Sequence, residues 1–217
     1  MLRFGSADGP VVVAAPALFE EGNRTRAFLV RILRLLAERG VASALPDLPG
    51  QSESLVPTSQ ARLADWRAAF AAAVRAQRRP AFVLALRGGA LVDGDTEPVA
   101  RFHVAPSTGA SLMRDLIRVA QAGAREEGRL FDPAELDRSG PPLLMAGNLF
   151  DRALLAELRA AEPSPADRTV RLTSDTDPAD LRLEGRPLWR AAEADVDEPL
   201  ALSLADDVAA LVRRCAA

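Results

Sequence analysis

The sequence contains no lysine, one histidine, His103, and one cysteine, Cys215. Without lysine the chain can form neither a lysine Schiff base nor a phosphate-binding loop that depends on lysine. One thiol excludes an intramolecular disulfide, and so few histidine and cysteine side chains argue against a metal centre built from them. We therefore expect no metal and no cofactor, and we expect a reducing, cytoplasmic location.

Long apolar runs and a strong net charge are also missing. The formal net charge of the 217 residues is −3, which gives no indication of a nucleic-acid partner. The first apolar run, Val11 to Leu18, meets Glu20 and Glu21 too early for a signal peptide or a membrane-spanning helix. With 48% hydrophobic residues and no linker-like segment, residues 1–217 are predicted to form a single domain.

Apolar runs of strand length alternate with helical periods in the first half of the chain. This alternation is typical of a parallel sheet flanked by helices. The predicted strands of this half are residues 11–17, 41–45 and 81–86, and the predicted helices are residues 25–40, with Asn23 as N-cap, and 63–77. Later we predict strands at 99–105, 143–146, 169–173 and 187–191, a polar loop at 175–184, and helices at 107–131, 151–161 and 202–215.

The segment Ala81–Ala90 reads as a buried strand that runs directly into a glycine turn. In α/β proteins, ligands and reacting groups lie at such carboxyl ends of parallel strands. The five residues Ala85 to Gly89 have the spacing of a nucleophile elbow, G-x-S-x-G, with Arg87 at the serine position. Apolar periodicity after the elbow lasts for about one helical turn. The segment therefore predicts a site but not the usual nucleophile.

Four stretches of the chain resemble the α/β-hydrolase superfamily and, within it, the exosortase A system-associated hydrolases of type 2. They are Pro16–Arg26 with its paired glutamates, the loop Leu45–Gly50, the arginine-bearing elbow Leu86–Gly89, and Ala146–Leu149. The resemblance implies an α/β-hydrolase-like three-layer fold with a mostly parallel central sheet, helices on both faces and a small lid-like helical insertion at residues 107–141. It also implies a bacterial locus for exopolysaccharide export. The usual N-terminal hairpin is reduced to at most Leu2–Phe4.

The residues of a serine hydrolase are incomplete. Such an enzyme needs a nucleophile, a base and an orienting acid within hydrogen-bond reach. The elbow lacks the serine, and the segment before the last helix contains no histidine. His103 precedes the predicted lid, which is the wrong chain order, so we interpret it as structural. Ser52 and Ser54 are predicted to bond the backbone, and Asp47 to fix its own turn. We predict no catalytic residue.

Arg87 has three interpretations. It could form a structural ion pair with Glu20 or Glu21, bind an anion together with the N–H groups of the turn, or be a remnant on a scaffold without activity. A buried guanidinium is costly without a counter-charge, so we predict Glu21 as its partner. The predicted ligand-binding residues of this crevice are Arg87, Gly88, Glu21, Asn23 and Arg24.

The helix predicted at residues 107–131 carries arginines on one side and apolar residues on another. Arg114, Arg118 and Arg125 favour a solvated face, and the alternative is that they attract an acidic glycan or a lipid phosphate. The apolar face, with Leu112, Leu116 and Val119, favours core packing or a homodimer contact over a lipid pocket. The ligand class predicted for the crevice is an anionic small molecule or a glycan or lipid precursor.

Three functional hypotheses follow from these features. The leading hypothesis is a non-catalytic accessory or binding protein of bacterial exopolysaccharide production. The alternative is an unconventional hydrolase, esterase-like or acyltransferase-like, in which Arg87 stabilises negative charge and Glu21 activates water. A third reading is a purely structural interaction module.

Overall fold

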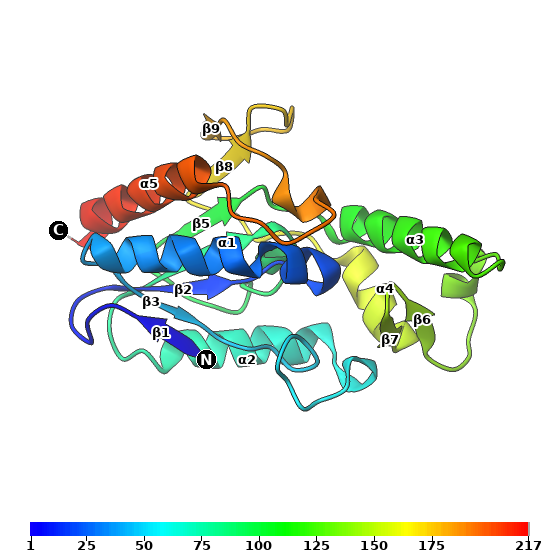
Figure 1. The fold of residues 1–217 in the computed structure, drawn as a ribbon. Coiled ribbons are helices and arrows are strands. Elements are labelled where there is room, and N and C mark those ends of the chain that lie inside the picture. Colours follow the sequence, from blue (N-terminus) through cyan, green and yellow to red (C-terminus); the bar gives the residue numbers. More distant parts are fainter. Residues whose placement is uncertain (217) are drawn as a thin grey trace.

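A seven-stranded sheet forms the middle layer of the protein (Figure 1). The structure is a computed structural model, and it describes residues 1–216. The strand order is β1-β3-β2-β4-β5-β8-β9, in which β1 is antiparallel to β3 and the other neighbours are parallel. The strands are β1 (Leu2–Phe4), β2 (Val11–Ala15), β3 (Ala42–Leu45), β4 (Ala81–Leu86), β5 (Arg101–Val104), β8 (Arg168–Leu172) and β9 (Leu181–Leu183).

The central strands β2 and β4 are buried on both faces. Every residue of the two strands is buried, as expected where helices cover both sides of a parallel sheet. Alternate side chains enter different cores: Phe82 and Leu84 pack on one face, and Val83 and Ala85 on the other. The uniformly apolar sequence of these strands is therefore explained by the two cores.

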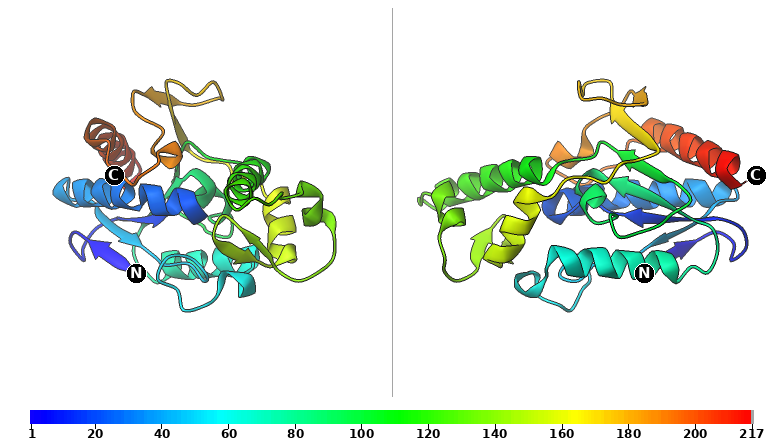
Figure 2. Two further views of the ribbon diagram at one scale, coloured as in Figure 1. Left: turned by 45° about the vertical axis from the view of Figure 1, so that its right-hand side comes forward. Right: turned by 180° about the vertical axis from the view of Figure 1, so that it is seen from behind.

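Helices cover the two faces of the sheet (Figures 1 and 2). The helices α1 (Phe19–Glu38) and α5 (Glu198–Ala216) pack on one face, and α2 (Leu63–Arg75) packs on the other. The predicted three-layer α/β architecture is confirmed. Within residues 1–216, none of the helices has both the length and the apolar character to cross a membrane.

A cap lies beyond the carboxyl ends of the parallel strands, at the right of Figure 1. It consists of α3 (Gly109–Glu126), the short 3-10 helix η3 (Pro133–Asp137), the hairpin β6 (Leu143–Met145) and β7 (Asn148–Phe150), and α4 (Arg152–Ala160). Residues 143–146 were expected to form a strand, and β6 is one, but it pairs only with β7, outside the main sheet. The cap thus continues past residue 141, where the predicted insertion ends, and the insertion itself stays a prediction.

The start of α1 differs from the prediction. The helix begins at Phe19, so Asn23 lies inside it and the expected N-cap is wrong. Two physical features explain the early start. Glu20 and Glu21 stand in the first turn, where carboxylates stabilise the helix dipole. Gly22 is also compatible with the tight approach to the preceding loop, since an added Cβ would lie 2.5 Å from the carbonyl oxygen of Ala17.

The last part of the sheet also differs from the prediction. The expected polar loop at residues 175–184 contains β9, whose Leu181 and Leu183 pack against the core while Arg182 is exposed. The expected strand at 187–191 is a single 3-10 turn, η4 (Leu188–Arg190). Because β9 already occupies the edge of the sheet, this segment instead buries Leu188 and Trp189. The remaining short helices are η1 (Thr58–Gln60) and η2 (Arg87–Leu91).

Candidate functional site

The turn after β4 has the backbone of a nucleophile elbow. Arg87 adopts a left-handed φ of +54°, a conformation that a non-glycine residue rarely takes. Position 89 has to be glycine because the chain passes close to β2, and an added Cβ would lie 2.3 Å from the carbonyl oxygen of Ala15. The five residues of η2 then replace a long helix, as the sequence predicted. The elbow therefore presents a guanidinium at the place of a serine hydroxyl.

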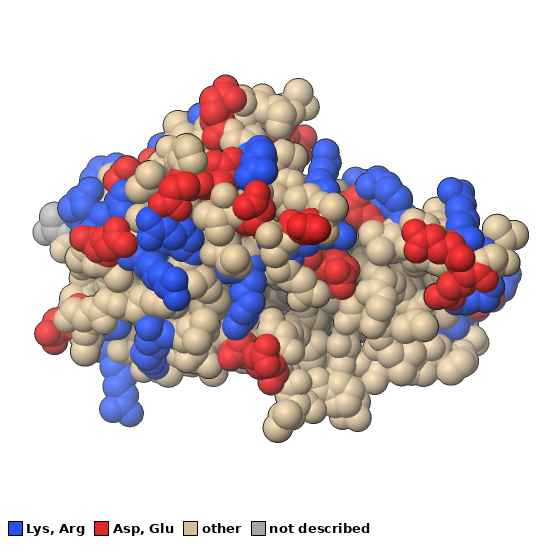
Figure 3. Space-filling model, in the orientation of Figure 1, with Lys and Arg blue, Asp and Glu red and all other residues tan. Residues whose placement is uncertain are grey.

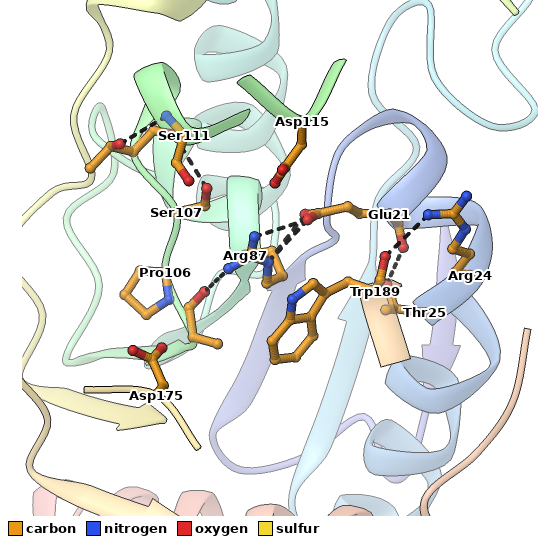
Figure 4. Close-up of polar contacts among 12 residues, drawn as sticks. Glu21, Arg24, Thr25, Arg87, Pro106, Ser107, Ser111, Asp115, Asp175 and Trp189 are labelled. Atoms are coloured by element: carbon orange, nitrogen blue, oxygen red, sulfur yellow. Dashed lines mark hydrogen bonds and ion pairs between the residues drawn. The ribbon is translucent and has the colours of Figure 1, made fainter. Parts of the chain in front are cut away.

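Glu21 pairs with Arg87, as predicted. Arg87 Nε donates to both carboxylate oxygens at 3.2 Å, and Nη2 donates to Oε1 at 2.9 Å (Figure 4). The two side chains are each about 10% exposed, so the pair is largely removed from solvent. The structural pairing is thus established, whereas the ligand-binding role of both residues stays a prediction.

Two further groups hold the guanidinium of Arg87. Its Nη1 donates to the carbonyl oxygen of Ala105 at 3.1 Å, and its Cζ lies 4.7 Å from the centre of the Trp189 ring. A guanidinium carries five N–H groups, so these contacts leave one N–H on each terminal nitrogen. Arg87 is therefore mainly a structural cation that keeps a small capacity to bind an anion.

Burial raises the pKa of Glu21 above its ordinary value. The positive charge and hydrogen bonds of Arg87 oppose this rise, and the negative charge of Asp115 adds to it. Asp115 extends from α3 toward Glu21 in Figure 4. The site thus places two carboxyl groups and one guanidinium at the meeting point of α1, η2 and α3.

A polar cavity of about 600 Å³ opens beside Arg87. We call it the arginine chamber, because five arginines and three aspartates line it together with hydroxyl groups at the start of α3. The charged residues are Arg87, Arg114, Arg118, Arg171, Arg190, Asp115, Asp175 and Asp177, and the hydroxyl residues of the α3 start are Ser107, Thr108 and Ser111.

A second cavity, of about 290 Å³, lies between the start of α1 and the cap. We call it the apolar groove. Its apolar lining consists of Leu18, Phe19, Leu112, Leu116, Val119 and Ala146, and Glu21 and Arg24 also border it. The two cavities adjoin, because Asp115, Arg118, Trp189 and Arg190 line both. Next to the groove, the face of the cap over α4 and the β6–β7 hairpin carries few charges (Figure 3).

The other predicted ligand-binding residues have different positions. Arg24 borders the apolar groove and donates to the carbonyl oxygen of Trp189 at 3.2 Å. Asn23 does not line this crevice as expected, since it is exposed, donates to Glu20 and borders a separate small pocket. The helical rotation from Glu21 to Asn23 turns the two side chains apart. Gly88 is buried next to the side chain of Leu18, and its ligand-binding role stays a prediction.

The residues singled out on α3, the predicted lid helix, differ in their surroundings. Arg114 and Arg118 line the arginine chamber, and Arg125 lies outside both cavities. Leu112 and Leu116 are buried, so the predicted core packing is confirmed for them, while Val119 is 37% exposed at the groove. The homodimer contact stays a prediction.

The loop before η1 holds the two predicted serines outside the arginine chamber and the apolar groove. Ser52 Oγ accepts from the Arg26 side chain at 3.4 Å and not from the backbone, so that expectation is wrong for Ser52. Ser54 Oγ accepts from the backbone N–H groups of Gly50 and Val56, which confirms its backbone role. Asp47 does not fix its own turn as expected. Instead it accepts from the amino group of Met1 at 2.9 Å and from Arg26, because β1 brings the start of the chain beside it.

His103 is structural, as predicted. It lies on β5 between Phe102 and Val104, which pack into the α1/α5 core, so it faces the other side of the sheet. Its Nε2 lies 2.8 Å from Oδ2 of Asp93, and both side chains are almost fully buried. It lies outside the arginine chamber and the apolar groove, so it cannot serve as a base for groups bound there.

We predict that Asp93→Ala lowers the free energy of unfolding by about 3 kcal/mol, because it leaves His103 without its buried hydrogen-bond partner and Arg101 without the carboxylate that it faces at 3.6 Å. Urea denaturation measures the change. Asp95→Ala removes an exposed aspartate two residues away and is expected to change stability by less than about 0.5 kcal/mol. Equal effects of the two substitutions would contradict a structural role of the Asp93 contact.

Sequence reasoning missed Trp189, Asp115 and the carbonyl group of Ala105. Trp189 was hidden in a segment interpreted as a strand. Its position in a proline-punctuated stretch, outside any helical period, was the available signal. Asp115 was overlooked beside the arginines of the same helix, although it follows Arg114 directly. No sequence pattern marks Ala105, whose contribution is a backbone group placed by β5.

Comparison with known proteins identifies the fold. No family profile matches the chain, and no curated protein matches it. Solved structures do: α/β-hydrolase domain-containing protein 10 from mouse has a TM-score of 0.58 at 13% identity over 97% of this chain and 93% of its own. A candidate hydrolase from Agrobacterium vitis has a TM-score of 0.54 at 16% identity over 99% of this chain and 90% of its own. A structure from work on the metagenome-derived lipolytic enzymes LipS and LipT has a TM-score of 0.53 at 15% identity over 97% of this chain and 95% of its own. The chain therefore has the α/β-hydrolase fold.

Proposed function

We propose that this α/β-hydrolase-fold chain is a non-catalytic binding or accessory protein that takes an anionic ligand in the arginine chamber. The observation that carries the proposal is Arg87 at the nucleophile position, held by Glu21, Ala105 and Trp189. A fold alone does not determine function, so the chemistry of the site decides. Arginines around a cavity supply charge and N–H donors for an anion, and none of them is a nucleophile.

The setting that we propose is bacterial exopolysaccharide production, with the protein in the cytoplasm. Support for this part comes from the four stretches that resemble the exosortase A system-associated hydrolases of type 2, among them the paired glutamates and the arginine-bearing elbow. A chamber lined by five arginines also suits the charged precursors of such a system.

An unconventional hydrolase or transferase is the second candidate. It is favoured by one observation, which is that burial raises the pKa of Glu21 next to a guanidinium, as in many acid–base catalysts. The lipolytic enzymes named with one of the solved neighbours supply an analogy of fold. Against it, both oxygens of Glu21 already accept hydrogen bonds from Arg87, which limits their access to water.

We expect the purified protein to leave short-chain p-nitrophenyl esters intact, because no hydroxyl or thiol stands at the elbow. Release of p-nitrophenol is followed for the wild type, Ser52→Ala, Arg87→Ala and Glu21→Gln, and all four proteins are expected to match the buffer rate. Turnover that co-purifies with the protein, survives Ser52→Ala and disappears in Arg87→Ala or Glu21→Gln would overturn the non-catalytic proposal and favour the second candidate. Circular dichroism of each variant controls for loss of folding.

A further inference from the structure

We infer that the site takes an amphipathic anion, with a phosphate-type head group in the arginine chamber and a hydrocarbon chain in the apolar groove. The inference rests on the proposed function, since it names the ligand class of the same site. Its basis is the junction of a polar cavity and an apolar one, which share Asp115, Arg118, Trp189 and Arg190 as a common wall.

The arginine chamber has positive charge that the protein does not neutralise. Arg87 pairs with Glu21, Arg118 with Asp115, and Arg171 with Asp175 and Asp177. Among residues 1–216, no ion pair involves Arg114 or Arg190, which also line the chamber. Two guanidinium groups are therefore available for an anion, and a phosphate can accept hydrogen bonds from both.

The start of α3 adds to this field. Its N–H groups are partly used, since Gly109 donates to the carbonyl oxygen of Ala161 and Ser111 to the hydroxyl of Thr108. The Ser107 hydroxyl donates to the carbonyl oxygen of Thr108 at 3.3 Å, so the direct donors are the arginines and the hydroxyl group of Ser111. The positive end of the helix dipole contributes electrostatically. Helix and arginines both favour negative charge on the chamber side.

The Arg87–Glu21 ion pair, which lies between the two cavities, sets the orientation of the ligand. Arg87 lines the chamber but not the groove, whereas Glu21 lines the groove but not the chamber. The charges that border the groove balance, with three carboxylates, Glu21 among them, against three guanidinium groups, whereas the chamber has five guanidinium groups against three carboxylates. In the chamber a negative head group lies on the guanidinium side of the pair. The head group therefore belongs in the chamber.

The groove suits a hydrocarbon chain. Leu18, Leu112 and Leu116 are buried side chains that still border it, and Val119 stands exposed at its edge. A polar ligand would gain no hydrogen bond from these side chains, whereas a chain of methylene groups would exclude water from them. The apolar face of α3, which was predicted to serve as core or dimer contact, thus also forms one wall of a binding groove.

Isothermal titration calorimetry with a series of ligands tests the inference. The series consists of inorganic phosphate, glycerol 3-phosphate, butyl phosphate, octyl phosphate and uncharged octanol. Each methylene that enters the groove is expected to strengthen binding about threefold to fourfold. Octyl phosphate should therefore bind on the order of a hundredfold more tightly than butyl phosphate. Inorganic phosphate and glycerol 3-phosphate should bind weakly, and octanol at least about tenfold more weakly than octyl phosphate.

Matched variants locate the two halves of the ligand. Arg114→Ser combined with Arg190→Ser is expected to weaken octyl phosphate binding about tenfold or more, and Arg125→Ser, on the same helix but outside both cavities, to leave it unchanged. Val119→Glu is expected to abolish the gain from chain length, since it puts a carboxylate at the groove. Leu202→Glu also replaces an exposed apolar side chain by a carboxylate, but on α5, and should have no effect.

The outcomes separate the inference from the function on which it rests. Octyl phosphate binding no tighter than inorganic phosphate, with both lost in the double arginine variant, would overturn the lipid-type ligand and support an anion site for free phosphates. Octanol binding as tightly as octyl phosphate would overturn the head-group assignment. Absence of binding by every phosphate would overturn both the inference and the anion-binding function. Equal weakening by Arg125→Ser would show unspecific charge attraction and would also overturn the site.

Discussion

Glu21→Leu is expected to lower the free energy of unfolding by about 3–5 kcal/mol, because it leaves the Arg87 guanidinium buried without its counter-charge. Arg87→Met should cost a similar amount by isolating the carboxylate. The double variant is expected to lie within about 1 kcal/mol of the wild type or above it, since two apolar side chains need no charge compensation. Urea denaturation of the four proteins gives the coupling free energy directly.

The pH dependence distinguishes the two single variants. In Arg87→Met the Glu21 carboxyl loses the cation that lowers its pKa, so burial raises that pKa further. A carboxyl with a raised pKa binds its proton in the folded state, so the stability from that proton is present at low pH and is lost as the pH rises through the folded pKa. Arg87→Met should therefore be more stable at pH 5 than at pH 8, relative to wild type.

Glu21→Leu has no carboxyl at this position. Because burial raises the Glu21 pKa in the wild type as well, the wild type itself loses some stability as the pH rises, and the loss caused by Glu21→Leu should be smaller at pH 8 than at pH 5, opposite to that of Arg87→Met. A cost below about 1 kcal/mol for both single variants, or a double variant less stable than either, would contradict a buried, coupled pair.

The proximity of Asp115 to Glu21 adds a control for the pH dependence of Arg87→Met. Asp115→Asn removes a negative charge that raises the pKa of Glu21, so in the Arg87→Met background it should narrow the difference between pH 5 and pH 8.

Gly109→Ala is expected to lower the free energy of unfolding by about 3 kcal/mol or more through overpacking. An added Cβ would lie 1.6 Å from the carbonyl oxygen of Leu158 and 2.8 Å from that of Ala161. Both obstacles are backbone atoms, so α3 and α4 must separate to admit the methyl group. Thermal unfolding followed by circular dichroism measures the loss.

Gly123→Ala in the same helix is the matched control. No atom lies within 4 Å of the Cβ that it would add, so the higher helix propensity of alanine should raise stability by about 0.5–1 kcal/mol. Opposite signs for the two substitutions are the expected result. If Gly109→Ala were as stable as wild type, the close contact between the start of α3 and the end of α4 would not exist in solution.

The sequence predicted those parts of the fold whose signals are local. The uniformly apolar β4, the glycines of the elbow and the one-turn η2 can be read from residues 81–91 without knowledge of the rest. The Arg87–Glu21 pair was predictable for a different reason, since a buried cation requires a carboxylate and Glu21 follows the neighbouring strand β2.

The errors lie where distant contacts decide the structure. Polar residues 175–184 contain β9 only because Leu181 and Leu183 can pack beside β8 at the sheet edge. The Pro187 segment turns instead of extending because β9 already occupies the sheet edge, and Trp189 stacks on Arg87, about a hundred residues earlier in the chain. The arginine chamber could not be foreseen for the same reason, because it joins side chains from η2, α3, β8 and η4.

The stacking of Trp189 on Arg87 has a spectroscopic consequence. The protein has two tryptophans, and the other, Trp66, is fully buried with its Nε1 donating to the carbonyl oxygen of Pro49. Trp66 borders neither the chamber nor the groove, whereas the Trp189 indole borders both. Entry of a molecule into either cavity thus changes the surroundings of one fluorophore and not the other. The fluorescence of Trp189 should therefore change when a ligand binds in the arginine chamber or the apolar groove. A Trp189→Phe protein, which retains only Trp66, is the control.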